Sequence, residues 1–109
     1  MNSNPPGEEG LYPHKDDAMH EELDELRSLY VDYLRGEIDT FRSLVARRDF
    51  DDIRSLGHRL KGSGGSYGFQ HISDLGETIQ YLQDSAEWEE IEILLHRLEE
   101  MYEQLAEGL

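Results

Sequence analysis

A histidine, two nearby cations and several glycines lie close together in the segment GHRLKGSGGSYG, residues 57–68. His58 follows Arg54 by four positions and precedes Lys61 by three and Gly62 by four. Residues three and four apart are neighbours on a helix, so the imidazole would be flanked by cations and bordered by a position without a side chain. Unprotonated imidazole is a nucleophile, and cations beside it favour anions. The pattern therefore indicates an exposed histidine in surroundings suited to an anion such as a phosphoryl group.

The distribution of charge supports this interpretation. The chain has 109 residues, with 10 Lys and Arg against 25 Asp and Glu, and a formal charge of -15. Between positions 42 and 61, however, six basic residues are accompanied by only three acids; the basic residues are Arg42, Arg47, Arg48, Arg54, Arg59 and Lys61. In an acidic protein this local reversal is the area best suited to a transferable anion.

Composition excludes several classes of function. A net charge of -15 argues against binding to nucleic acid or to an anionic membrane, because both need clustered cations. Cysteine is absent, so disulfides, thiolate metal sites and cysteine nucleophiles are excluded. The sequence has neither a long apolar run nor the pattern of a signal peptide. We therefore expect a soluble, cytoplasmic monomer, and the ends at Met1 and Leu109 favour a short independent chain.

The apolar pattern predicts one all-α domain. Residues 1–15 hold all three prolines and few apolar groups, so we expect a flexible tail there and a helical domain over 16–109. Apolar residues recur at steps of three and four in four segments, which predict helices at about 18–47, 49–67, 70–84 and 88–108. Short connections make consecutive helices antiparallel neighbours, so the expected fold is an up-down four-helix bundle. The first helix is long enough for its N-terminal turns to overhang the bundle.

The second predicted helix has a core face and a face that carries the histidine. At about 100° per residue, His58 lies nearly opposite the core face, which is formed by Ile53, Leu56, Leu60, Gly64 and Tyr67. Each interior glycine costs about 1 kcal/mol of helix preference relative to alanine. A helix with so many glycines therefore suggests that they serve packing or function. An exposed histidine alone is usually only surface, and Gly64 is expected to serve helix packing. The combination with Lys61 and the neighbouring glycines is what favours a functional role.

These residues resemble the H-x-L-K-G-S signature of histidine-containing phosphotransfer (HPt) domains, through the segment His58-Arg59-Leu60-Lys61-Gly62-Ser63. The likeness continues from Gly68 to Gln80 and covers about residues 50–82. The run GSGGSYGF is also similar to the phosphoacceptor domain of chemotaxis histidine kinases. Departures from the family pattern include Gly57, where alanine is common, and Gln80, where glutamate is usual.

The resemblance implies a four-helix bundle in which His58 is the phosphoacceptor and Lys61 lies beside the phosphoryl group. It implies exchange of the phosphoryl group with an aspartate of a response-regulator receiver domain, which would also supply Mg²⁺, so this chain holds no cofactor or metal of its own. The chain is expected to be a phosphorelay intermediate rather than an enzyme, because it has no P-loop or other nucleotide-binding element. The partner-binding residues are expected to be Arg54, Gly57, Arg59, Gly62 and Gly65.

Three other interpretations stay open at this point. The chain could be a phosphoacceptor served directly by a histidine kinase, or a non-catalytic helical adaptor or dimerisation bundle that uses the glycine strip for packing. A metal-binding bundle is disfavoured, because di-iron bundles use Glu-x-x-His motifs and no glutamate lies three positions before any of the five histidines.

Overall fold

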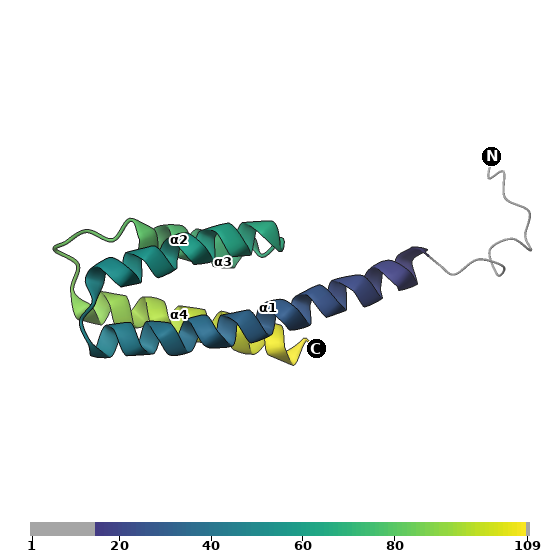
Figure 1. Cartoon of the computed structure of the whole chain (residues 1–109), viewed down its shortest axis with the longest axis horizontal. Helices are drawn as coiled ribbons and strands as arrows, with labels where there is room; N and C mark the ends of the chain where they lie inside the picture. The colour runs from purple at the N-terminus through teal and green to yellow at the C-terminus, as the bar shows by residue number, and fades with distance from the viewer. Residues whose placement is uncertain (1–14, 109) are drawn as a thin grey trace, which may run out of the picture.

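Residues 15–108, the part that the computed structural model describes, form four α-helices and no strand. The helices are α1 (Lys15–Ala46), α2 (Phe50–Ser66), α3 (Gln70–Gln80) and α4 (Trp88–Glu107). Consecutive helices are antiparallel, with α2 and α3 forming the upper pair and α1 and α4 the lower pair in Figure 1. Each of α1 and α3 packs against both α2 and α4. The predicted all-α, up-down four-helix bundle is therefore confirmed. The predicted tail, residues 1–15, lies outside the described residues except for Lys15, which begins α1.

Capping interactions explain the two ends of α2. The side chain of Asp49 accepts a hydrogen bond from the backbone N–H of Asp52, which makes Asp49 the N-cap that its residue type predicts. After the last turn, Gly68 has a φ of +82°, and the N–H of Phe69 bonds to the carbonyl of Gly64 at 2.7 Å. Glycine adopts this left-handed conformation without the steric penalty of a Cβ atom, so the chain reverses at once into α3.

The core of the bundle is made by the apolar stripes of all four helices. Its fully buried members of largest volume are Tyr30, Phe41, Leu34, Ile53, Leu56, Leu60, Ile79, Ile91 and Leu98. Tyr67 was expected in the core stripe, but it caps the C-terminal end of α2 and is 44% exposed, so that prediction is wrong. The third helix also ends at Gln80, four residues before the predicted Asp84.

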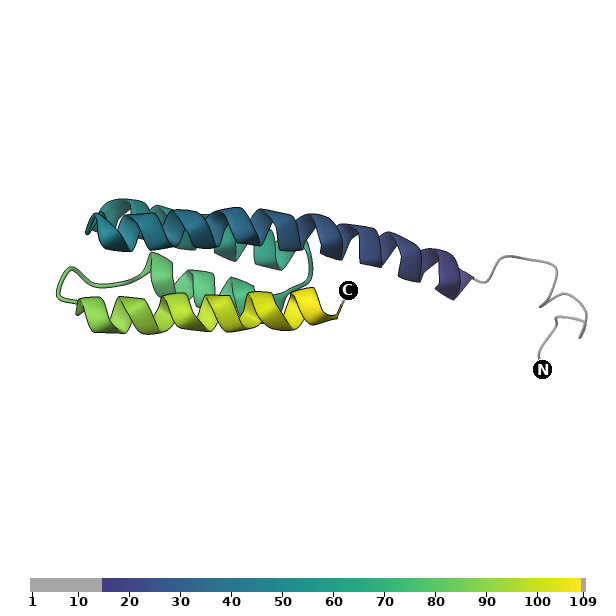
Figure 2. The same cartoon turned by 90° about the horizontal axis from the view of Figure 1, so that it is seen from below.

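The N-terminal part of α1 extends beyond the other three helices, as Figures 1 and 2 show. Leu23 and Leu26 continue the apolar series of α1 in this part of the helix but are about half exposed. The expected overhang is thus confirmed. None of the helices in residues 15–108 combines the length and the apolar composition needed to cross a membrane.

Tyr30 gives the bundle a pH-dependent stability. It is 1% exposed, its hydroxyl lies 3.0 Å from Ser63 Oγ, and burial raises its pKa to about 12. In the unfolded chain the pKa of tyrosine is about 10, so the folded state holds this proton more tightly. Its contribution, about 3 kcal/mol, is present below pH 10 and is lost as the pH rises toward 12. In Tyr30→Phe, the fall of the unfolding free energy between pH 9.5 and 11.5 should therefore be shallower. Urea titrations of both proteins test this, and equal slopes would contradict it.

Candidate functional site

Three glycines bring the backbones of α2 and α3 into contact. We call Gly57 and Gly64 of α2 and Gly76 of α3 the glycine seam. A Cβ atom at Gly57 would lie 2.4 Å from the backbone nitrogen of Gln80, and one at Gly76 would lie 2.4 Å from that of Lys61. At Gly64 a Cβ atom would meet the backbone nitrogen of Ser73 at 2.6 Å. Because no side chain fits between the helices, only glycine permits this approach.

The seam places the end of α3 beside His58. The imidazole is exposed, and its Nδ1 atom lies 3.0 Å from Nε2 of Gln80 across the two helices. Ser73 of α3 helps to fix the register of α3 against α2, because its hydroxyl donates a hydrogen bond of 2.9 Å to the carbonyl of Lys61. The ring of His58 is thus fixed at Nδ1, and its Nε2 atom is the nitrogen left for a reaction.

Gln80 can partner both neutral forms of the imidazole. The Oε1 atom of Gln80 is buried and has no hydrogen-bond partner within the described residues. An amide has a donor at one end and an acceptor at the other, so turning the Gln80 amide brings Oε1 to an Nδ1–H of His58. In that arrangement the lone pair of the ring is on Nε2. In the sequence, Gln80 stands out only as a departure from the family pattern, because its partner His58 lies 22 residues away on another helix.

Arg54 and Lys61, the two cations that neighbour His58 on its own face of α2, are both paired with carboxylates. Arg54 forms an ion pair with Asp84, which follows α3, and its guanidinium carbon lies 4.3 Å from the ring centre of Phe50. Lys61 Nζ lies 3.8 Å from Oε2 of Glu77 on α3. The cationic flank expected from the sequence is therefore present, but it is balanced by acids that the sequence pattern alone did not place there.

The residues predicted to bind a partner fall into two groups. Gly62 and Gly65 are exposed, and no described atom lies within 4 Å of a Cβ atom built at Gly62. Gly57 is buried in the glycine seam, so its assignment to a partner surface is wrong: its missing side chain serves the packing of α3. Arg59 points to α1, where its Nε and Nη2 atoms donate hydrogen bonds of 3.1 and 3.2 Å to the carboxylate of Glu37. This hydrogen bonding raises the pKa of Arg59.

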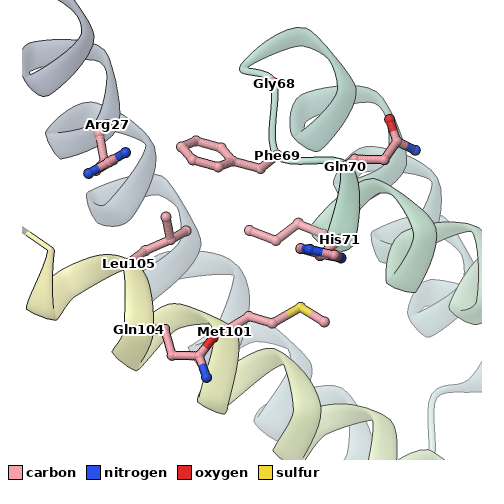
Figure 3. A pocket seen from close by; sticks show the side chains of 9 residues that line it. Arg27, Gly68, Phe69, Gln70, His71, Met101, Gln104 and Leu105 are labelled. Carbon is pink, nitrogen blue, oxygen red and sulfur yellow. The ribbon is translucent and has the colours of Figure 1, made fainter. Parts of the chain in front are cut away.

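The surface around His58 is an open hollow rather than a deep pocket. It is lined by Arg54, Ser55, His58, Arg59 and Gln80. A separate groove, lined in part by Arg27, Phe69, Met101 and Leu105, lies between α1, the α2–α3 turn and α4, and it does not include His58 (Figure 3). A shallow hollow around a nucleophile suits contact with another protein better than enclosure of a small substrate.

Comparison with known proteins identifies the family. A model of the Hpt domain matches residues 25–108. The chain belongs to the Hpt domain family. This Hpt domain is also 30% identical over 63 residues to the aerobic respiration control sensor protein ArcB of Escherichia coli O157:H7, a match that covers 58% of this chain and 8% of ArcB. No solved structure gives a significant match.

The family assignment establishes the general activity. Hpt domains take part in histidine phosphotransfer within two-component phosphorelay signalling, and they interact with response regulators and histidine kinases. The resemblance found in the sequence is therefore confirmed at the level of family, fold and general role.

Proposed function

We propose that His58 is the phosphoacceptor of this Hpt domain, and that it exchanges a phosphoryl group with an aspartate of a response-regulator receiver domain. The observation that carries the proposal is the exposed imidazole held at Nδ1 by the side-chain amide of Gln80. With that amide turned so that its unpartnered Oε1 accepts from Nδ1–H, the lone pair of the ring is on Nε2. The exposed Gly62, four residues later, supports it by leaving room for a partner surface beside the ring.

In the proposed reaction, the lone pair of Nε2 attacks the phosphorus of the aspartyl phosphate. The N–P bond forms as the P–O bond to the aspartate breaks, and the electron pair of that bond returns to the carboxylate. Gln80 accepts the Nδ1–H hydrogen bond through Oε1, so the ring stays oriented while it gains positive character. Phosphoryl transfer depends mainly on positioning and on stabilising charge over the phosphoryl oxygens, and Lys61 is the cation proposed for that second role. Mg²⁺ is proposed to come with the receiver domain.

Transfer from a labelled receiver tests the proposal. The Hpt domain is mixed with a panel of ³²P-labelled phospho-receiver domains and Mg²⁺, and the label on the Hpt domain is tested for stability in acid and in base. A phosphoramidate on histidine should be lost in acid and kept in base. Labelling by a histidine kinase and ATP, with none from any receiver, would instead favour an acceptor served directly by the kinase. A folded protein that takes no label from either source would favour the adaptor interpretation.

Replacing Lys61 with alanine should slow transfer to His58 about tenfold. A hydrogen bond to a charged group contributes about 1.5 kcal/mol, which corresponds to about one factor of ten in rate. The measurement is the rate of label transfer from one phospho-receiver under single-turnover conditions, with Lys61→Arg as the variant that retains the charge. An unchanged rate in Lys61→Ala would show that the lysine has no part in the reaction.

A further inference from the structure

The cation proposed to stabilise a phosphoryl group on His58, Lys61, is paired with Glu77 of α3. Lys61 Nζ is 3.8 Å from Oε2 of Glu77, and its distance to the ring centre of Tyr81 is 5.6 Å. The side chains of Lys61 and Glu77 are 39% and 54% exposed, so neither is held by burial and the ammonium can change partner. Glu77 lies in the last turn of α3 and Tyr81 directly follows the helix, so both come from the part of the chain that also carries Gln80.

A phosphoryl group on His58 would change the balance of charge at this position. It carries close to two negative charges at neutral pH, against the single charge of Glu77. Glu77 then acts against the phosphorylated form in two ways, because it competes for the ammonium of Lys61 and repels the phosphoryl oxygens. Asp84, which pairs with Arg54, adds a second carboxylate beside the site, but Arg54 is also held over the ring of Phe50.

We propose that Glu77 is a positioning residue that holds Lys61 in the unphosphorylated protein and releases it to the phosphoryl group, and that Glu77 thereby lowers the equilibrium occupancy of phosphohistidine. This inference rests on the proposed function of His58. The covalent step is unchanged: only the partner of the Lys61 ammonium changes, from the carboxylate of Glu77 to the phosphoryl oxygens. In a relay, such a residue favours passing the phosphoryl group onward over retaining it.

The test is the equilibrium of phosphotransfer in wild type and in Glu77→Gln. Each protein is mixed with one phospho-receiver, and the ratio of label on the Hpt domain to label on the receiver is measured once it is constant. Glu77→Gln should raise this ratio about threefold at low salt, in keeping with the modest strength of a partly exposed ion pair. At about 1 M salt, where screening acts over about 3 Å, the difference should largely disappear.

Two controls separate this effect from a general change in charge or fold. Glu100→Gln removes one carboxylate from an exposed position of α4, a helix that packs on α1 and α3, and it should leave the ratio as in wild type. In a background of Lys61→Ala, Glu77→Gln should have a smaller effect, because only the repulsion is then removed. Thermal unfolding of each variant shows whether the bundle is intact.

The outcomes distinguish the inference from the proposed function. If wild type takes the label on His58 but Glu77→Gln gives the same or a lower ratio, the role of Glu77 is wrong and that of His58 stands. An effect of equal size in Glu100→Gln would likewise overturn the role of Glu77. If wild type takes no label from any receiver or kinase, the proposed function fails and this inference fails with it.

Discussion

His58→Gln should lose all acid-labile phosphorylation while the bundle stays folded. A carboxamide nitrogen is not a nucleophile toward phosphorus, so the reaction has no acceptor in this variant. Glutamine is a good helix former, and position 58 is exposed on the face of α2 away from the core, so the substitution leaves no cavity. The measurement is label transfer from a phospho-receiver, with the circular dichroism and melting temperature of both proteins recorded beside it.

His71→Gln is the matched control for this substitution. His71 is also an exposed histidine, in the first turn of α3, and it lines the groove between α1 and α4 rather than the hollow around His58. The control should take up label at the wild-type level. Label that persists in His58→Gln, or that disappears only in His71→Gln, would show that the acceptor lies elsewhere.

Gly57→Ala should destabilise the bundle by about 3 kcal/mol, near the upper end for an overpacked core. The added Cβ atom would lie 2.4 Å from the backbone nitrogen of Gln80 and 2.8 Å from the carbonyl oxygen of Gly76. Both are backbone atoms, so no change of rotamer relieves the contact and α3 must move away from α2. Urea unfolding measures the loss. The same movement should shift Gln80 from His58 and slow phosphotransfer even where the protein remains folded.

Gly62→Ala gives the opposite expectation for stability. No described atom lies within 4 Å of a Cβ atom at Gly62, and the residue is inside α2, so alanine should stabilise the bundle by up to about 1 kcal/mol. Because position 62 is exposed next to the site, any slower transfer in this variant would come from the partner interface. Equal stability changes in Gly57→Ala and Gly62→Ala would contradict the assignment of Gly57 to helix packing.

The arrangement of the helices could be predicted because it depends on local patterns. Apolar residues at steps of three and four define α1, α2 and α4, and Asp49 marks the start of α2 by its side chain. The end of α3 is harder to predict from the sequence, because Leu82 continues the helical spacing although the helix stops at Gln80. The position of Tyr67 around the axis of α2 places it on the same side as the core residues. The helix ends at this residue, however, and the ring remains partly exposed.

The candidate site could be predicted only as far as one helix determines it. The exposure of His58, Gly62 and Gly65 follows from their angles around α2, and the structure places all three at the surface. The partners of the site come from α3, and which residues meet depends on the register of two helices packed through the glycine seam. A glycine adds nothing to apolar periodicity, so the sequence pattern does not indicate that Gly57 is buried. The spacing of Gly57 and Gly64, seven residues apart on one face, is the signal that could have indicated the seam.

Mapping the phosphoryl group on the wild-type protein tests the central claim most directly. After phosphotransfer from a receiver domain, long-range ¹H–¹⁵N spectra of the histidine rings at neutral to basic pH identify the residue and the ring nitrogen bonded to phosphorus. We expect the spectrum of His58 alone to change among the five histidines, with the N–P bond at Nε2 and with Nδ1 protonated toward Gln80. An N–P bond on any other histidine, or a labelled protein whose histidine signals are all unchanged, would contradict the account.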